Sequence, residues 1–529
     1  MKSLTPYWLA EMVLSCLLLF SAGCSQNTID PESSSDGSLK NFPGLGAVSF
    51  PNSGSAEAQE PFYRGVLLMH SFEFRPAAEA FREAQEIDPE FALAYWGEAM
   101  TYNHPLWRSV DCESGRAVLE RLASTPEERR QKAPTKREKM YLDAVEALYD
   151  SDGLPISAPT QEVCGTGGPA GGEIDLNKLK RDSDYMQAMK RLVDAFPEDD
   201  EARSFYALSI LGVKNGTRDF TTYMRAASEV LPVFERNPRH PGAAHYIIHS
   251  FDDPVHASLG LPAANAYSEI APDAAHAQHM TSHIFVALGQ WDRNVSANIR
   301  ARDLQDAERA ARGLKPNICG HYSAWLHYGY LMLGQKEEAI EMMDLAYQHA
   351  QSEMNTSEWD YFVSMRARQL LDLGDESLIG RWDVPLDRIP NSKGGRGYGK
   401  ARFKYQITDA LLGLRWGDES KARTLLEMPR PSISGEALQL DQLAGLLAIS
   451  EGKTDKGIAL LEKAAAAEEA LPLEFGPPQI VEPAYETLGN ALLKLGRHSE
   501  AKAAFQRATE RTPRRPPATK GLSEANDLI

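Results

Sequence analysis

The chain has 529 residues, of which 43% are hydrophobic and 25% are charged, and this is the composition of an ordinary globular protein. The formal net charge is −18, so an acidic surface argues against a nucleic-acid partner. No stretch of 18 apolar residues occurs in the body of the chain, and we expect no membrane-spanning helix there.

The first residues have the pattern of an export signal. An apolar run over residues 12–20 follows a basic residue, and it is too short to span a bilayer. The sequence FSAGCSQ around Cys24 resembles a bacterial lipobox, where a signal peptidase cuts before the cysteine. This resemblance implies removal of residues 1–23 and lipidation of Cys24, which would anchor the protein to a membrane. With Ser25 next to it, the expected location is the bacterial cell envelope, at the outer membrane and facing the periplasm. The alternative is a secretory signal that ends in a cysteine by coincidence.

Besides the lipidated Cys24, three cysteines remain in the mature chain: Cys112, Cys164 and Cys319. Because the number is odd and the compartment is oxidising, at most one disulfide is expected within the chain. Cys112 and Cys164 flank one insert-like region and are the preferred pair.

Composition also divides the chain into segments. Residues 24–57 are rich in Ser, Gly, Asn and Pro, which is typical of a flexible tether. The stretch RIPNSKGGRGYGKARF at 388–403 predicts a Gly-rich loop between two helical segments. These segments are the N-terminal and central part, 58–387, and the C-terminal part, 404–520, which a tail at 521–529 follows.

A 34-residue helical repeat is clearest at 482–515. Small residues let two antiparallel helices approach closely, Phe505 fills the gap between them, and Pro513 ends the second helix. Nine positions match the consensus of the tetratricopeptide repeat: Tyr485, Leu488, Gly489, Leu492, Gly496, Ala501, Phe505, Ala508 and Pro513. The chain therefore resembles the tetratricopeptide repeat superfamily over most of 58–520. This resemblance implies an all-α, right-handed solenoid of helix–turn–helix repeats, whose first helices build a concave groove.

Histidines recur in the first helices of the central repeats. The same 34-residue spacing places repeat starts near residues 58, 92, 207, 241, 275, 320 and 438. In the family, positions 2, 5, 9, 12 and 13 of each first helix face the groove, because that spacing keeps them on one face. In this frame the groove-facing residues include His70, His104, His245, His249, Asp252, His276, His279, His283 and His321.

One interpretation of this pattern is a metal site. His245 with His249, and His279 with His283, are pairs spaced by four residues that can each chelate one ion from a helix face. Neighbouring repeats bring their first helices to about 10 Å of one another, so both pairs can contribute to one site. Asp252 would be a further ligand or would orient one. The implied cofactor is a divalent transition metal: Zn, Cu, Ni or Fe.

A second interpretation is a groove that binds a protein, a peptide or a small ligand without metal. Its lining would be His70, Trp96, Asn103, His104, His276 and His321. A third is that the histidines are structural hydrogen-bonding residues and that Trp96 belongs to the core. Geometry distinguishes the first two interpretations. A metal site requires imidazoles that converge within about 3–5 Å of one another, whereas imidazoles about 8 Å apart favour a groove.

Three blocks resemble a bacterial group of exported tetratricopeptide proteins: NHPLW at 103–107, HYIIHSFDDPVHASLGLPAA at 245–264 and HMTSHIFVALGQWD at 279–292. The FGPP before the last repeat extends this resemblance, which implies export and the domain layout and implies no reaction. No HExxH motif, nucleophile elbow, phosphate loop or dinucleotide-binding glycine pattern occurs. The sequence therefore favours a lipid-anchored scaffold over an enzyme. It would bind a protein, peptide or small-ligand partner through the His-rich groove, with metal binding as the alternative.

Overall fold

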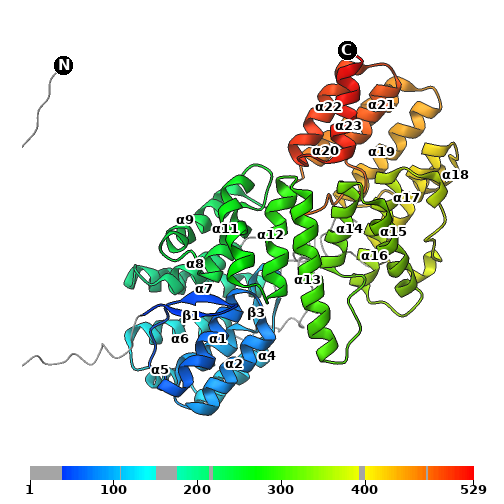
Figure 1. Cartoon of the computed structure of the whole chain (residues 1–529). Coiled ribbons are helices and arrows are strands. Elements are labelled where there is room, and N and C mark those ends of the chain that lie inside the picture. Colours follow the sequence, from blue (N-terminus) through cyan, green and yellow to red (C-terminus); the bar gives the residue numbers. More distant parts are fainter. Residues whose placement is uncertain are drawn as a thin grey trace, which may run out of the picture.

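The computed structural model describes residues 38–107, 109–149, 176–213, 218–391, 400–471, 473 and 475–529. The predicted signal peptide, Cys24 and Cys164 lie outside these ranges. Over the described residues the chain folds almost entirely into helices. Figure 1 shows them as successive hairpins that run from an N-terminal lobe, through a central green layer, to a C-terminal lobe.

The helices of the N-terminal and central parts follow one another along the chain. Two short antiparallel strand pairs accompany them: β1 (Lys40–Phe42) with β2 (Gly46–Val48), and β3 (Asn103–His104) with β4 (Ser109–Val110). The N-terminal helices are α1 (Gln59–His70), α2 (Phe74–Ile87), α3 (Ala92–Met100), α4 (Cys112–Leu122), α5 (Pro126–Lys132) and α6 (Lys136–Tyr149). The central helices are α7 (Leu176–Ala195), α8 (Asp200–Gly212), α9 (Phe220–Arg236), α10 (Pro241–Phe251), α11 (Ala257–Ile270), α12 (Ala275–Ala287) and α13 (Trp291–Ala311).

The C-terminal lobe continues the same pattern. Its helices are α14 (His321–Leu333), α15 (Lys336–Ala350), α16 (Thr356–Leu373), α17 (Ala401–Trp416), α18 (Ser420–Leu426), α19 (Ser434–Ser450), α20 (Thr454–Glu469), α21 (Ala484–Lys494), α22 (His498–Arg511) and α23 (Pro516–Asp527). Short 3₁₀ turns connect some of them: η1 (Ala56–Ala58), η2 (Pro105–Trp107), η3 (Glu376–Leu378) and η4 (Leu386–Arg388). The predicted all-α solenoid of helix–turn–helix repeats is confirmed, and α10, α12 and α14 begin within a residue of the predicted repeat starts at 241, 275 and 320.

The same packing unit occurs at both ends of the solenoid. Phe505 of α22 lies between Gly489 of α21 and Gly521 of α23, where an added Cβ would come within 2.7 and 2.3 Å of the phenyl ring. Phe81 of α2 lies in the same way between two glycines of α1 and α3. Only a residue without a side chain allows three helices to close around one aromatic ring, so these glycines define the repeat.

The N-terminal repeat packs against α10 of the central repeats. His70, the last residue of α1, accepts a hydrogen bond at Nδ1 from the Tyr246 hydroxyl of α10 at 2.9 Å. The next loop places Phe72 against His245 of α10, with ring centroids 4.3 Å apart. First helices that would line an open groove in an extended solenoid are therefore buried between repeats here.

The segment before α1 is part of this packing. Residues 38–57, predicted as part of a flexible tether, form the β1–β2 hairpin and a turn. The backbone N–H of Ala47 donates to the Arg239 carbonyl at 3.0 Å, and the Ala47 carbonyl accepts from Asn237 Nδ2 at 2.7 Å. Phe50 is fully buried against Trp96 and Tyr141, and burial of such a side chain stabilises the fold by about 2–3 kcal/mol. The tether prediction is therefore wrong for residues 38–57.

Other segment predictions differ at their edges. The predicted tail at 521–529 is mostly part of α23, whose Ala518, Gly521 and Ala525 are buried against the last repeat. The helix that follows the Gly-rich loop begins at Ala401, inside the predicted loop. Among the described helices, none is long and apolar enough to cross a membrane.

Candidate metal centre

Six histidines from three first helices meet in the middle of the solenoid. Helix α10 contributes His245 and His249, α12 contributes His276, His279 and His283, and α14 contributes His321. His249 is half-buried, and the other five are buried. The rings form two groups of three, in each of which one ligand atom per residue lies within 4.8 Å of the other two.

Site 1 consists of His245, His249 and His276. The Nε2 atom of His245 lies 3.0 Å from Nε2 of His249 and 3.1 Å from Nε2 of His276. The pair on α10 is brought together by the four-residue spacing, and His276 arrives from the second residue of α12.

Site 2 consists of His279, His283 and His321. The Nε2 atom of His279 lies 3.0 Å from Nε2 of His283 and 2.9 Å from Nε2 of His321. In both sites the Nε2 atoms converge within the 3–5 Å range that metal ligation requires.

The outward nitrogens of four of these rings have hydrogen-bond partners. Nδ1 of His245 donates to the backbone carbonyl of His70 at 2.7 Å, and Nδ1 of His283 donates to the Asp252 carboxylate at 2.5 Å. Nδ1 of His279 lies 2.7 Å from Oδ1 of Asn298, and Nδ1 of His321 lies 3.2 Å from the Tyr361 hydroxyl. Acceptors behind the outward nitrogen are the usual support of a metal-binding histidine.

The amide of Asn298 has a defined orientation. Its Nδ2 donates to the carbonyl and the Oδ1 of Asn294, at 2.9 and 2.8 Å, one turn earlier on α13. The amide oxygen therefore points to His279 and accepts from its Nδ1.

These partners determine which ring nitrogen carries hydrogen. A carbonyl, an amide oxygen and a carboxylate only accept, so Nδ1 of His245, His279 and His283 is the donor. In the neutral rings Nε2 then carries a lone pair. The Nε2 atoms of His279 and His283 thus direct lone pairs at each other across 3.0 Å, a contact that needs a cation between them. A metal ion satisfies all three nitrogens of the site at once, whereas a proton satisfies one pair.

Burial keeps the rings of site 1 neutral, which is the form that binds metals. Desolvation lowers the pKa of His245 to about 3, and it lowers the pKa values of His249 and His276 well below the usual 6.5. Near neutral pH these imidazoles hold no extra proton, so a metal ion need not displace one.

Aromatic rings surround both sites. Phe72 and Tyr267 pack on His245 with centroids at 4.3 and 5.3 Å, and Trp325 and Phe475 pack on His283 at 4.4 and 5.0 Å. Phe475 belongs to the FGPP block, so the linker between α20 and α21 covers site 2. Such walls fix the ring orientations and exclude water.

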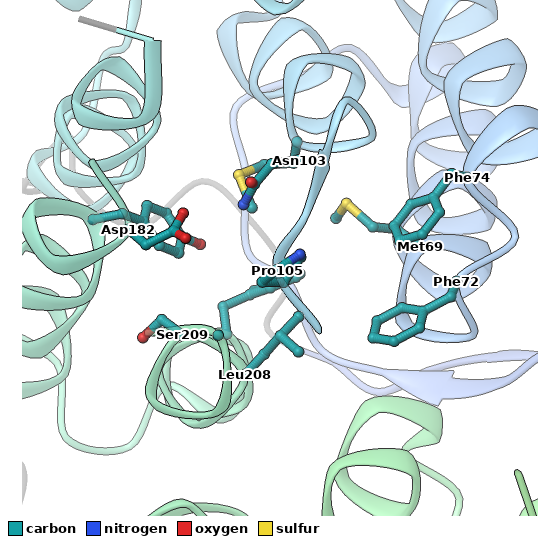
Figure 2. A pocket seen from close by; sticks show the side chains of 12 residues that line it. Met69, Phe72, Phe74, Asn103, Pro105, Asp182, Leu208 and Ser209 are labelled. Atoms are coloured by element: carbon teal, nitrogen blue, oxygen red, sulfur yellow. The ribbon is translucent and has the colours of Figure 1, made fainter. Parts of the chain in front are cut away.

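Phe72 holds an uncommon backbone conformation. Its φ is +58°, and among the described non-glycine residues only Arg514 shares a positive φ. The Phe72 ring also lines a cavity of about 20 Å³, the size of about one water, together with Met69, Asn103 and Asp182. Figure 2 shows Phe72 and Met69 on one side of this cavity and Asp182 and Ser209 on the other. The Phe72 ring therefore lies between the cavity and site 1. Backbone strain of this kind is often found at functional sites.

A third group, His70, Glu201 and His240, contrasts with sites 1 and 2. Nδ1 of His70 accepts from Tyr246, and its Nε2 donates to Glu201 at 2.7 Å. Nδ1 of His240 accepts from the backbone N–H of Ala243 at 3.2 Å, so its Nε2–H faces Glu201 at 3.2 Å. Burial alone raises the pKa of Glu201, but the two imidazoles outweigh burial and lower it to about 2. An imidazole N–H thus faces the carboxylate from each side, and this group holds in place the carbonyl that supports His245.

The remaining predicted groove residues lie inside the fold. Trp96 is fully buried between Phe50 and Tyr141, and Asn103 accepts from Lys178 Nζ at 3.0 Å. His104 stacks on Phe74 at 4.1 Å, and burial lowers its pKa to about 4. The structure therefore joins His276 and His321 to the metal candidates and keeps Trp96, Asn103 and His104 apart from them.

Several site residues escaped the sequence analysis. Asn298, Tyr361, Phe72, Trp325 and Phe475 support or cover the histidines. One signal existed for the first of them: two asparagines one turn apart inside a helix are unfavourable there unless they hydrogen-bond.

One family model and several solved structures are similar to this chain. Residues 483–515 match the tetratricopeptide repeat family model. No curated protein matches the sequence. The structure is similar to that of yeast Tom70 at 11% identity, with 89% of this chain and 88% of that chain covered and a TM-score of 0.31. It is also similar to the human IFIT1 dimer with PPP-AAAA at 13% identity, with 88% and 89% covered and a TM-score of 0.35. This protein is thus an α-helical solenoid with a tetratricopeptide repeat at residues 483–515.

Proposed function

We propose that this protein binds transition-metal ions at site 1 and site 2. The observation that carries the proposal is the pair of Nε2 clusters, with separations of 2.9–3.1 Å and acceptors fixed behind three of the six rings. The leading sequence hypothesis, a partner bound by groove histidines, requires accessible rings, and five of the six are buried. The geometry therefore favours the alternative of the sequence analysis.

The donor set limits the choice of metal. Each site offers three neutral imidazoles, which suit Zn, Cu, Ni and Fe and are poor ligands for Ca²⁺ or Mg²⁺. Three protein ligands leave a coordination position free for water or a small ligand. Asp252 would act behind His283 and not as a ligand, because its Oδ2 accepts from the outward nitrogen of that ring.

Elemental analysis tests the proposal. Untagged protein, purified without chelators and exposed to each metal in turn, is expected to hold about two ions per chain, one for each three-ligand site. His283→Phe keeps the volume, removes a ligand of site 2 and is expected to lower the content by about one ion. His498→Ala, on the surface of α22, is the matched control and should keep both ions.

The contradicting outcome is a wild-type protein with no stoichiometric metal under any of these conditions. Equal metal content in His283→Phe and in wild type would equally reject site 2. Circular dichroism of the metal-free proteins separates loss of ligand from loss of fold.

A tetratricopeptide fold also provides surfaces for protein partners. Together with the predicted lipid on Cys24, this describes an envelope-bound metal protein that meets its partner at a membrane. Fatty-acid labelling of cells tests the anchor, since the label should be lost in Cys24→Ala.

A further inference from the structure

Sites 1 and 2 differ in the exposure of one ligand and in the support behind their rings. We infer that site 1 is an exchange site, at which the protein takes up and releases a metal ion through His249, whereas site 2 retains its ion. This inference rests on the metal binding proposed above, and it assigns a different task to each of the two sites.

The first difference is how far the ligands lie from solvent. All three histidines of site 2 are buried, and so are His245 and His276 of site 1. His249, the third ligand of site 1, is half-buried. An acceptor molecule in solution can therefore reach site 1 at the edge that His249 forms, whereas site 2 offers no exposed ligand.

The aromatic cover over the two sites shows the same difference. The Trp325 ring contacts all three rings of site 2, with centroid distances between 4.4 and 5.4 Å. Phe72 is the corresponding ring of site 1, and it lies 4.3 and 5.3 Å from the two buried rings of that site. Its distance to the His249 ring is 6.1 Å, so the cover is loosest over this ligand.

The second difference is the support behind the rings. His279 and His283 each donate Nδ1–H to a buried acceptor, at 2.7 and 2.5 Å, so neither ring can turn without breaking a hydrogen bond. The Nδ1 atom of His249 has no hydrogen-bond partner among the described residues, and the ring is joined only through Nε2 to His245. The His249 ring can therefore leave an ion and return to it at low cost.

These supports also decide how well each site tolerates the loss of its ion. In empty site 2, the Nε2 lone pairs of His279 and His283 face each other across 3.0 Å, because the hydrogens stay on Nδ1. In empty site 1, no acceptor holds a hydrogen on Nδ1 of His249, so Nε2–H of this ring can donate to Nε2 of His245 at 3.0 Å. Site 1 can thus be empty with this contact hydrogen-bonded, whereas site 2 keeps a buried contact without a donor.

Together these differences define an exchange step at site 1. Three imidazoles leave one coordination position of the ion free, so a nitrogen ligand of a small chelating molecule can bind there first. The bond between the ion and Nε2 of His249 then breaks, and the ring moves toward solvent as a neutral imidazole with its hydrogen on Nδ1. Only ligands change in this step, and uptake of an ion follows the same steps in reverse.

The kinetics of metal release test the inference on the full chain. Untagged protein that holds about two zinc ions per chain, one for each three-ligand site, is mixed with an excess of a small coloured chelator. We expect two phases of equal size, with one ion released at least about tenfold faster than the other, since support behind the ligands changes metal binding by about 10- to 100-fold. His249→Gln should lose the fast phase and keep the slow one, whereas His283→Phe should lose the slow phase.

Asn298→Leu provides the matched variant, because it removes the acceptor behind His279 and leaves all six ligands in place. The slow ion should then be released at least about tenfold faster, with the fast phase unchanged. His498→Ala, on α22, is the control and should release both ions as the wild type does. If a variant does not fold, as judged by circular dichroism, wild-type crystals loaded with zinc and then soaked in chelator replace it. Their anomalous peak at site 1 should disappear before the peak at site 2.

The outcomes are separable from those of the proposed function. Release of both ions in a single phase, or a fast phase that persists in His249→Gln, would overturn the exchange site and leave metal binding intact. Crystals in which the peak at site 2 disappears first, or a wild-type protein that holds a single ion, would also overturn it. No bound zinc, copper, nickel or iron at all would reject the proposed function itself.

Discussion

Orientation of single side chains distinguishes the two metal candidates from the third histidine group. In sites 1 and 2, acceptors outside the cluster hold Nδ1–H and turn lone pairs inward. In the His70–Glu201–His240 group, donors outside the cluster hold Nδ1 and turn N–H groups inward to a carboxylate. Similar residues at similar distances therefore have opposite chemistry, and only the first arrangement offers converging lone pairs to a metal ion.

A substitution of Asp252 tests whether the acceptors behind the rings support metal binding. Asp252→Asn keeps an acceptor for His283 but removes the charge that strengthens that ring as a ligand. We expect metal affinity at site 2 to fall about 10- to 100-fold, as competition with a chelator of known affinity would measure.

The control for this variant is Asp194→Asn, an exposed carboxylate paired with Lys190. Its metal affinity should equal that of the wild type. Unchanged affinity in Asp252→Asn would show that the carboxylate does not support a metal ligand.

The sequence predicted four of the six candidate ligands and one support, Asp252, but not the other supports. The i, i+4 spacing of His245 with His249 and of His279 with His283 is local, so it could be read directly. The other partners come from α1, α13 and α16, and no local pattern connects them to the histidines. Burial of Trp96 and Asn103 was missed because it depends on where α1 packs.

At the scale of helices, the repeat is defined by small residues around one phenylalanine. This could be predicted at 482–515 because Gly489, Phe505 and Pro513 occupy consensus positions. The third helix of the unit, α23, could not, because Gly521 lies beyond the consensus and its role depends on contact with Phe505.

Gly521→Ala tests this packing. A Cβ at this position would lie 2.3 Å from the Phe505 ring, so the helix or the ring has to move. We expect the free energy of unfolding of the C-terminal repeat to fall by about 1–3 kcal/mol in chemical denaturation.

A second substitution distinguishes a clash from a general loss of flexibility. In a Phe505→Leu background the ring is gone, so Gly521→Ala should cost much less than it does in the wild type. An equal cost in both backgrounds would contradict the packing argument.

At the scale of the whole molecule, segments from the N-terminal repeat and from before the last repeat cover the central histidines. The N-terminal repeat covers site 1 through Phe72, and the linker before the last repeat covers site 2 through Phe475. A buried ion cluster joins the last repeat to α16: Arg515 contacts Asp372 at 2.5 Å and Glu486 at 2.7 Å. These contacts join residues that are far apart in the sequence, and so the repeat pattern alone predicted an open groove.

This cluster predicts a pH dependence of stability. It holds two carboxylates for one guanidinium, and burial raises the pKa of Glu486 from 4.5 to about 7 although Arg515 opposes the shift. Between about pH 4.5 and 7 the folded protein therefore keeps a proton that the unfolded chain has lost. The free energy of unfolding should fall as pH rises through this window, by at most about 3 kcal/mol from this group.

Denaturation at pH 5 and pH 8, with chelator present, measures this effect. Glu486→Gln cannot titrate, so the fall in stability between these two pH values should be smaller than in the wild type. The same pH dependence in both proteins would mean that Glu486 does not carry the extra proton.

The most direct test of metal binding at the two three-histidine sites is an anomalous difference map from crystals of the protein loaded with zinc or copper, collected at the absorption edge of the metal. We expect two peaks. One should lie about 2.0–2.1 Å from the Nε2 atoms of His245, His249 and His276, and the other at the same distance from those of His279, His283 and His321. A map with no peak among these six rings, from crystals that were exposed to the metal, would contradict this expectation.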